Sequence, residues 1–440
     1  MTSNKNIFNI SYPIFLTLIA QNIINVTDTA FLGRVSEVAL GASAIGGVLY
    51  IVIYMLGFGF SQGAQILIGR RNGEQNFAQI GIVFNNALLF NLLFAGVIFL
   101  VSSTAVPSLI KLVVSSENVY GEAVEYLDWR IYGFFFSFPN VIFRAFYVGI
   151  TKTRILTVSA IITATTNVVF DYLLIFGNFG CPEMGIAGAG LASILAEAST
   201  FAYLLFYTLT RIDVKKYGLF KFRNTNLQTT RRILDLSIFT MFQYFISLGT
   251  WFVFFIFIEH MGERPLAVTN IGRSLYALLM MPGAALATTT NTLISNLIGA
   301  GEKEKVLSFI HKMMRIVFLL VLPLMTFTLV FPHLFAGIYT NDSTLIDACV
   351  PVLRVVSIAM ICCAVSNILF NAVSGTGNTR TAFLIEMITL FFYMVYIYYT
   401  AIVVQYSLSV VWFSEFIYWG LIGIFAYFYM RNGKWKKKEI

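Results

Sequence analysis

The sequence predicts an all-α polytopic membrane protein, with twelve transmembrane helices in two pseudo-symmetric six-helix lobes around a central cavity. Three observations support this fold class. First, 58% of the 440 residues are hydrophobic and only 11% are charged, which is far from the composition of soluble proteins. Second, twelve apolar segments are long enough to cross a bilayer as helices. Third, motifs of the first half of the chain recur in the second half at a constant spacing.

The apolar segments define the expected spans. In the first half they cover residues 10–32, 44–68, 77–104, 123–148, 155–177 and 185–209. In the second half they cover residues 233–259, 266–298, 306–331, 348–374, 381–404 and 408–430. An even number of spans places both termini on the same side of the membrane. The first apolar segment is long and lacks a small-residue cleavage pattern, so we expect no cleavable signal peptide.

Lys and Arg residues indicate which side faces the cytoplasm. They concentrate in alternate loops, with seven between Arg211 and Arg232 and a further cluster from Arg431 to Lys438. The positive-inside rule therefore makes both termini cytoplasmic. We expect a multi-pass protein of the bacterial cytoplasmic (inner) membrane. The net charge of +8 reflects this topology and attraction to lipid, and it gives no reason to expect nucleic acid as a partner.

The cysteines and histidines do not favour metal or redox chemistry. The four cysteines show no CxxC pairing, and the three histidines are scattered along the chain. No nucleophile motif or metal-ligand spacing points to an enzyme that works inside the membrane. We therefore expect no enzymatic activity, no cofactor and no dedicated metal site.

An internal repeat divides the chain. Residues 40–46 resemble 266–272, and residues 149–154 resemble 375–380; 272 − 46 and 375 − 149 both give an offset of 226. Six spans per repeat make the two copies parallel, related by an axis along the membrane normal. We expect an N-lobe at 1–210 (spans 1–6), a basic cytoplasmic linker at 211–232 and a C-lobe at 233–440 (spans 7–12).

The first span carries a polar face inside an apolar helix. Thr17, Gln21, Asn25 and Asp28 follow one another at helical spacing and therefore share a face. An ionised carboxylate inside a bilayer costs about 2.5–3.5 kcal/mol, so this face needs a wet cavity or partner helices. The alternative is that Asp28, near the helix end, reaches the lipid headgroups.

Spans 5 and 6 carry polar groups at a similar depth. Asn167 and Asp171 are four residues apart on span 5, as are Ser193 and Glu197 on span 6. At 1.5 Å per residue, the two Asp lie about 6–9 Å from the outer ends of their spans and Ser193 about 10–12 Å. Asp28, Asn167, Asp171 and Ser193 can therefore meet at one level, with Glu197 about a turn deeper. Such a group can hold a small hard cation or share a proton. The alternative is a hydrogen-bonded network that joins three helices.

The second repeat lacks these acids. The positions 226 residues after Asp28 and Asp171 are Phe254 and Ile397. Candidate cavity or substrate contacts are polar groups on spans 1, 6, 7 and 10, namely Gln21, Asn25, Glu197, Gln243, Asn367 and Asn371.

Three charged residues of the second half fall inside expected spans. Glu386 lies near the cytoplasmic end of span 11, where we expect partial solvation. Glu415 lies deeper, in span 12. It either faces a cavity or packs between helices, and the sequence favours neither. Arg354 on span 10 would need an acid, and the sequence identifies none.

The order of these motifs resembles the multidrug and toxic compound extrusion (MATE) family. Pro13 and the DTAFLG segment at 28–33 come first, then Asn167 and Asp171, then the glycine-rich segment 185–193 that ends in Ser193. The likeness covers nearly the whole chain and is greatest to the DinF-like bacterial branch. Another branch of the family has essential acids on spans 7 and 10, and this chain has none deep in either.

The resemblance implies a function and a site. It implies a secondary active multidrug efflux antiporter that exports cationic amphipathic compounds in exchange for inward H+ or Na+. It assigns cation coupling to Asp28, Asn167, Asp171 and Ser193, and it implies that span 1 bends at Pro13. The expected partners are small cationic or amphipathic drugs and the lipid bilayer, and we expect a monomer.

Two questions stay open at this stage. We favour H+ over Na+ as the coupling ion because burial and mutual repulsion both disfavour the ionised forms of Asp28 and Asp171. Against this, Asn167 and Ser193 offer neutral oxygens of the kind that Na+ accepts. The alternative function is a lipid-linked oligosaccharide or cell-wall precursor flippase of the same broad architecture. Its polyanionic substrate would need a cavity lined with Lys or Arg, whereas the deep charges of this sequence are largely acidic.

Overall fold

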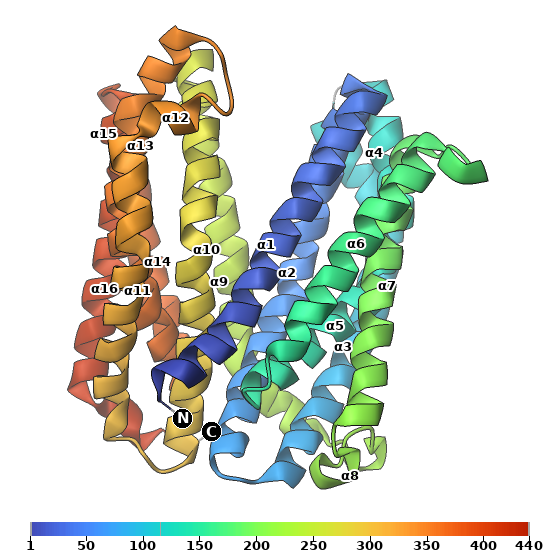
Figure 1. Ribbon diagram of the computed structural model, residues 1–440, viewed down its shortest axis with the longest axis vertical. Helices are drawn as coiled ribbons and strands as arrows, with labels where there is room; N and C mark the ends of the chain where they lie inside the picture. Colours follow the sequence, from blue (N-terminus) through green and yellow to red (C-terminus); the bar gives the residue numbers. More distant parts are fainter. Residues whose placement is uncertain (1, 115, 439–440) are drawn as a thin grey trace. The chain divides into compact units, whose positions relative to one another are not determined.

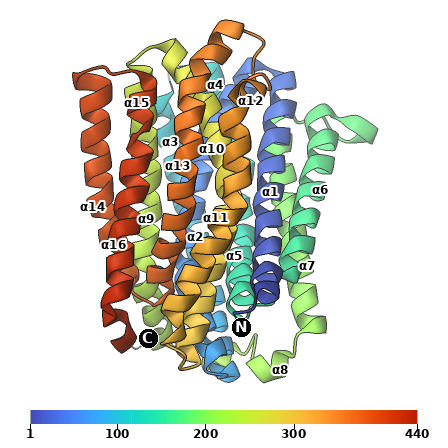
Figure 2. The same cartoon turned by 60° about the vertical axis from the view of Figure 1, so that its left-hand side comes forward.

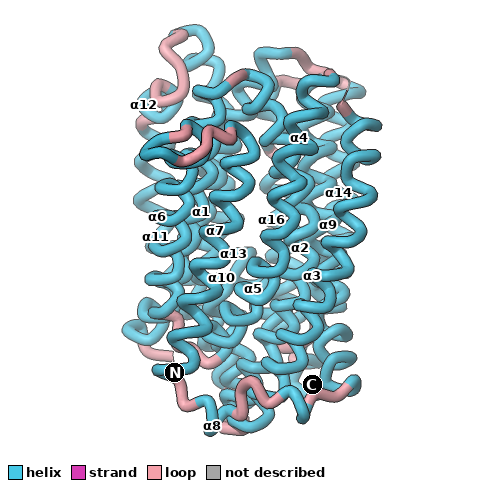
Figure 3. Tube along the Cα trace, turned by 90° about the vertical axis from the view of Figure 1, so that its right-hand side faces the viewer, coloured by secondary structure: helices cyan, strands magenta, loops and turns pink. Residues whose placement is uncertain are grey.

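Helices make up nearly all of the protein. The computed structural model describes residues 2–114 and 116–438, and these residues contain no strand (Figure 3). Twelve helical segments within them are long and apolar enough to cross a membrane, which confirms the predicted number of spans. Each of them extends past its predicted apolar segment at one or both ends, because helices continue into the polar layer beside the hydrocarbon, and three of them end one residue before the predicted end, at Phe176, Val330 and Val403.

The first six spans use seven main helices, because the fourth is built from two pieces. They are α1 (Asn4–Val35), α2 (Glu37–Gly73), α3 (Phe77–Val113), α4 (Glu117–Arg130), α5 (Phe134–Gly149), α6 (Arg154–Phe176) and α7 (Gly185–Arg211). A short 3₁₀ turn, Ile131–Gly133, joins α4 to α5 within the fourth span. The short helix α8 (Val214–Tyr217) follows α7.

The last six spans are each built around one long helix. They are α9 (Leu227–Glu259), α10 (Glu263–Gly299), α11 (Lys305–Val330), α13 (Ser343–Gly375), α14 (Thr379–Ile397) with a π-helical end at Tyr398–Val403, and α16 (Ser414–Asn432) preceded by α15 (Leu408–Trp412). The short helix α12 (Pro332–Ala336) connects α11 to α13.

Side-chain caps define several helix starts. The hydroxyl of Ser36 accepts from the N–H of Ala39 at 2.8 Å and begins α2. Asp342 begins α13 by accepting from the N–H and the hydroxyl of Thr344 at 2.9 and 2.8 Å. These bonds stabilise the ionised carboxylate and therefore hold the pKa of Asp342 below its usual value. The bond from the Thr344 hydroxyl has the largest effect.

The described chain forms two compact units, residues 12–241 (the N-terminal unit) and residues 242–438 with 2–11 (the C-terminal unit). The division falls inside two helices, between Ser11 and Tyr12 in α1 and between Met241 and Phe242 in α9. Within the C-terminal unit, Lys312 Nζ donates to the carbonyl of Thr2 at 2.6 Å and fixes the start of the chain.

Small residues on α2 allow its close packing in the N-terminal unit. A Cβ atom added to Gly46 would lie 2.7 Å from the ring of Tyr126, and one added to Gly57 would lie 2.8 Å from the ring of Phe138. Both rings belong to the buried core of this unit. Glycine at helix contacts permits this approach, as is usual among membrane helices.

The segment between α7 and α9 is held against α3. Asn85 accepts from the N–H of Phe220 at 2.7 Å and donates to the carbonyl of Gly218 at 3.0 Å. Asn86 accepts from the N–H of Asn226 at 3.0 Å. Gly218, Phe220 and Asn226 lie within residues 211–232, for which the sequence suggested a linker, and this stretch belongs to the N-terminal unit.

Helix pairs in the two units position the groups described below. In the N-terminal unit, α6 and α7 run side by side (Figure 1). In the C-terminal unit, α13 packs against α10, α11 and α16, and α14 packs against α16 (Figure 2).

Candidate functional site

The structure brings three of the four predicted coupling residues together. Asp28 comes from α1, and Asn167 and Asp171 come from consecutive turns of α6. In the amide orientation that satisfies its hydrogen bonds, Asn167 donates to Asp28 Oδ1 at 3.0 Å and to Asp171 Oδ2 at 3.2 Å. The other oxygen of Asp171, Oδ1, is buried without a hydrogen-bond partner among the described residues. Two carboxyl groups therefore share one amide donor.

Two of the three residues are fully buried. Asp171 is 0% exposed and Asn167 is 1% exposed, whereas Asp28 is half-buried. Asp28 lies seven residues before Val35, the last residue of α1, which is about 10 Å along the helix axis. Its bond with Asn167 holds it toward α6. A proton or a small cation at this site would meet the oxygens of the two carboxyl groups.

Ser193 occupies a different position from the other three. It lies on α7 with 8% of its surface exposed, in the wall of the same cavity as Asn167. Among the described residues, no hydrogen bond joins its hydroxyl to Asp28 or Asp171. Ser193 is therefore a neighbour of the acid pair at this site and not one of its bonded partners.

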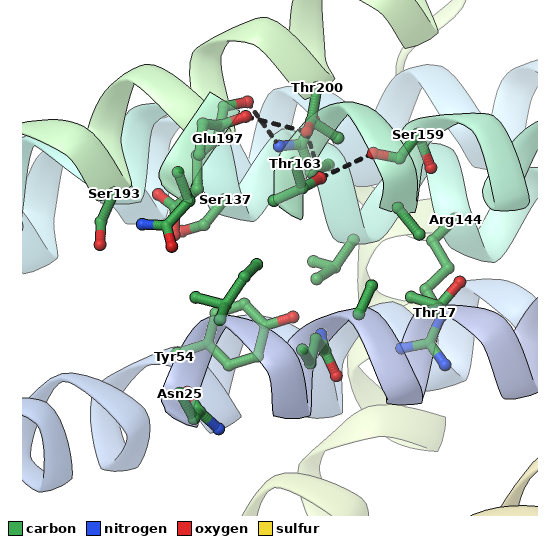
Figure 4. A pocket seen from close by; sticks show the side chains of 18 of the residues that line it. Thr17, Asn25, Tyr54, Ser137, Arg144, Ser159, Thr163, Ser193, Glu197 and Thr200 are labelled. Atoms are coloured by element: carbon green, nitrogen blue, oxygen red, sulfur yellow. Dashed lines mark hydrogen bonds between the residues drawn. The ribbon is translucent and has the colours of Figure 1, made fainter. Parts of the chain in front are cut away.

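A cavity of about 410 Å³ adjoins the acid pair inside the N-terminal unit. Its walls come from α1, α2, α4, α5, α6 and α7. Figure 4 shows Thr17, Asn25 and Tyr54 on one side and the polar groups of α6 and α7 on the other. The hydroxyls of Thr163 and Thr200 bond to each other at 2.5 Å across α6 and α7. Three of the predicted cavity contacts line it, namely Gln21, Asn25 and Glu197.

An ion pair in the cavity wall was missed by the sequence reasoning. Arg130 Nη2, at the end of α4, lies 2.8 Å from Glu197 Oε1 on α7. The Arg130 guanidinium lies over the ring of Tyr50, 3.6 Å from its centroid. The Tyr50 hydroxyl donates to Glu197 at 3.1 Å and to Ser137 at 3.2 Å. Glu197 therefore lines the cavity, as the sequence suggested, and is neutralised by an arginine.

The sequence offered one signal for this pair, an arginine inside an expected span, and the helix bounds of the structure supply the common level. Arg130 lies thirteen residues after the start of span 4 and Glu197 twelve residues after the start of span 6. Both spans run in the same direction, so both residues lie about 18–20 Å from the same side of the bundle. A buried arginine needs an acidic partner, and Glu197 was the acid at its level.

The cavity is less acidic than the sequence suggested. The charged residues of its wall are Arg130, Arg144 and Glu197. Arg130 pairs with Glu197, and the Arg144 guanidinium lies 5.3 Å from the ring centroid of Phe58. Asp28 and Asp171 lie beside the cavity, next to Asn167 in its wall.

The other predicted contacts lie in the C-terminal unit and do not line this cavity. Gln243 and Asn367 are 8% and 9% exposed, and Asn371 donates to the side-chain oxygen of Asn367 at 2.8 Å. The expectation of partial solvation for Glu386 is wrong, because this residue is only 3% exposed and accepts hydroxyl bonds from Ser247 and Tyr418. Among the described residues, no group of three or more His, Cys, Asp and Glu is arranged to hold a metal ion.

Known proteins with similar sequences carry transporter names. The chain is 25% identical over 390 residues to "Probable multidrug resistance protein NorM" of Thermotoga maritima, a match that covers 88% of this chain and 83% of that protein. It is 24% identical over 345 residues to the protein of the same name from Bacillus subtilis, covering 77% of this chain and 75% of that protein.

Solved structures share the fold. "Crystal structure of MATE in the straight conformation" superposes with a TM-score of 0.91 at 18% identity, covering 99% of this chain and 97% of that chain. "Reverse polarity of binding pocket suggests different function of a MOP superfamily transporter from Pyrococcus furiosus" gives a TM-score of 0.88 at 18% identity, with coverage of 99% and 97%. At this level of identity the likeness concerns the fold.

The family model of MatE matches the chain twice, at residues 13–173 and at residues 240–400. The second match begins 240 − 13 = 227 residues after the first, which agrees within one residue with the repeat spacing found in the sequence. The two matches together cover well over half of the chain. The protein therefore belongs to the MatE family, the multidrug and toxic compound extrusion transporters.

Proposed function

We propose that this protein exports cationic amphipathic compounds through the N-terminal unit, in exchange for protons that bind at Asp28 and Asp171. The observation that carries the proposal is the position of Asn167. Its side chain lines the cavity of about 410 Å³ and also donates to both carboxyl groups. A change of protonation at the acids is therefore transmitted to the cavity wall by one residue.

The proton acts by changing what Asn167 can bond to. Ionised carboxylates accept hydrogen bonds, whereas a protonated carboxyl group is also a donor. When a proton arrives, one carboxyl group gains an O–H donor, the hydrogen bonds among Asn167 and the two acids can rearrange, and α1 and α6 can then separate or repack. Each positive charge that moves inward releases about 2.3 kcal/mol per 100 mV of membrane potential. This energy is available to expel a compound from the cavity.

The surroundings of the pair favour a proton over Na+. Asn167 directs its nitrogen at the acids, and the Ser193 hydroxyl makes no bond to them, so few neutral oxygens face a cation at this site. Na+ needs several oxygen ligands in place of its water, whereas a proton needs one lone pair.

The cavity wall suits a flat compound with one positive charge. Tyr54 offers an aromatic face, and the acids beside Asn167 supply the negative potential. The names of the relatives, which are multidrug resistance proteins, support a drug-like compound as the substrate. Topology is part of the proposal, with both termini cytoplasmic and export from the cytoplasm outward.

A second candidate is a flippase for a polyanionic lipid-linked precursor. One observation favours it, which is the presence of Arg130 and Arg144 in the cavity wall. Arg130 is neutralised by Glu197, so the lining offers less positive charge than a polyanion requires.

Transport into inverted membrane vesicles tests the proposal. Uptake of ethidium, a cationic dye, should proceed in sodium-free medium when a pH gradient is imposed and should stop when a protonophore dissipates it. A sodium gradient imposed alone should drive no uptake. Strict dependence on sodium would overturn the choice of ion, and transport of an anionic dye in place of ethidium would favour the second candidate.

A further inference from the structure

The C-terminal unit buries two carboxyl groups that the proposed function does not use. Glu386 lies on α14 and Glu415 lies on α16, and each is 3% exposed. The two helices pack against each other in this unit (Figure 2). Burying a carboxylate without a positive partner is costly, so each of these acids calls for an explanation.

Glu386 has only hydroxyl partners. Its Oε1 accepts from the hydroxyl of Ser247 on α9 and from the hydroxyl of Tyr418 on α16, the latter at 3.1 Å. Neither partner carries a charge. Among the described residues, no Lys, Arg or His forms an ion pair with Glu386.

Glu415 is even less well satisfied. The hydroxyl of Tyr393 donates to its Oε1 at a long 3.5 Å, and its Oε2 is buried with no hydrogen-bond partner among the described residues. Two hydroxyls are also buried without a hydrogen-bond partner among the described residues. They belong to Ser414, on the same helix as Glu415, and to Thr389, on α14. Polar atoms that remain unpaired in a buried position call for an explanation, and a bound proton is one.

The two acids are connected by tyrosines. Tyr418, the partner of Glu386, lies three residues after Glu415 and therefore on the same face of α16. Tyr393, the partner of Glu415, lies seven residues after Glu386, two turns along α14, which is about 10 Å. The rings of Tyr393 and Tyr418 are in contact, with centroids 5.5 Å apart. Hydroxyl and carboxyl groups thus alternate along the contact between α14 and α16.

The remaining titratable groups near this line cannot neutralise it. Tyr276 on α10 accepts from Trp419 at 2.9 Å, and Cys363 on α13 is buried close to Tyr276 and Glu415. None of the groups that face the two acids from α9, α10, α13, α14 and α16 is basic. The two sites therefore need a positive charge from solution.

We propose that Glu386 and Glu415 form a second proton-binding site, in the C-terminal unit, connected by Tyr393 and Tyr418. A proton fits better than a metal cation because a proton needs one lone pair, and no group of three or more His, Cys, Asp and Glu among the described residues is arranged to hold a metal ion. A protonated Glu415 would give Oε2 the hydrogen that it lacks as a carboxylate. This site is separate from the acid pair at Asp28 and Asp171 and does not depend on their role.

Infrared difference spectroscopy on the purified full-length protein, reconstituted in lipid, tests the site directly. Raising the pH should remove carbonyl-stretch bands of protonated carboxylic acids. Glu386→Gln and Glu415→Gln should each delete one such band, and the double variant should delete both. Glu259→Gln is the matched control, because this residue is an exposed acid at the end of α9 and should leave the bands unchanged.

Further variants separate this proposal from the proposed function and from loss of fold. The bands of Glu386 and Glu415 should remain in an Asp28→Asn, Asp171→Asn double variant, whatever ion drives transport. Tyr418→Phe keeps the ring but removes a donor to the Glu386 carboxylate, so proton binding at Glu386 should tighten by roughly tenfold. If neither glutamine variant removes a band while both remain folded, or if sodium and not pH removes the bands, the proposal is wrong.

Discussion

Arg130 Nη2 and Glu197 Oε1 lie 2.8 Å apart inside the N-terminal unit, in the wall of its cavity, with the ring of Tyr50 against the guanidinium. The pair is almost fully buried, so each charge depends on the other. This dependence determines how substitutions at the two residues and at their neighbours change the stability of the protein.

Breaking the pair from one side should be more harmful than removing it. Glu197→Gln leaves a buried guanidinium without its carboxylate, and we expect a loss of roughly 3–5 kcal/mol in the free energy of unfolding. Adding Arg130→Met should recover a large part of that loss. Thermal unfolding of the single and double variants in detergent gives the coupling energy, and additive losses would show that the two charges do not depend on each other.

Gly133 should not tolerate even a methyl group. A Cβ atom at this position would lie 2.5 Å from Arg130 Nη1 and 2.6 Å from Glu197 Oε2. We therefore expect Gly133→Ala to lower the melting temperature and to displace the ion pair. Gly47→Ala is the matched control, because nothing lies within 4 Å of the added atom. Equal melting temperatures for the two variants would contradict this packing.

Neutralising either acid of the N-terminal unit should abolish coupled efflux. Asp28→Asn and Asp171→Asn remove a titrating group while keeping its size, so expression and folding should change little. The measurement is dye export from intact cells and from vesicles with an imposed pH gradient. Asp128→Asn provides the control, since Asp128 is an exposed acid on α4. If either acid variant transports dye as well as the unsubstituted protein, the two acids do not couple transport to the ion.

Polar groups of the C-terminal unit should not take part in ion coupling. Gln243 is a buried neutral amide, Asn371 donates to Asn367 on the next turn of the same helix, and none of the three lines the cavity of the N-terminal unit. We expect Gln243→Ala and Asn367→Ala to leave the pH dependence of dye transport unchanged, because neither amide titrates. An altered ion dependence in either variant would contradict this assignment.

The start of α13 should weaken in acid. The pKa of Asp342 is lowered in the folded chain, so its ionised cap adds stability above the unfolded value of 3.8 and loses it as the pH falls through the lower, folded value. Hydrogen exchange at the first turn of α13 should therefore accelerate below about pH 4. Asp342→Asn, which can still cap the helix, should remove this pH dependence, and an unchanged acid response in that variant would assign it to another group.

Hydropathy predicted the fold well because each span must satisfy its own backbone hydrogen bonds, which leaves few alternatives in a bilayer. Helical spacing also placed Asn167 and Asp171 on one face, and depth placed Asp28 beside them. Side-chain pairing was harder to predict. Glu386 was expected to be partly solvated, and the structure surrounds it with hydroxyl groups instead; the partner of Glu197, Arg130, was not predicted. Depth along a span limits which residues can meet, but it does not give the rotation of each helix about its axis.

The two helices that cross between the compact units have different mechanical properties. Since residues 218–226 are bonded to Asn85 and Asn86, the chain offers little slack there, and the crossings fall within α1 and α9. A helix yields by losing hydrogen bonds and not by small rotations, so bending at a crossing tends toward discrete states. In α1 the crossing lies beside Pro13, where one backbone bond is already missing, whereas α9 contains no proline. The first helix is therefore the compliant joint of the molecule, and α9 is the stiff one.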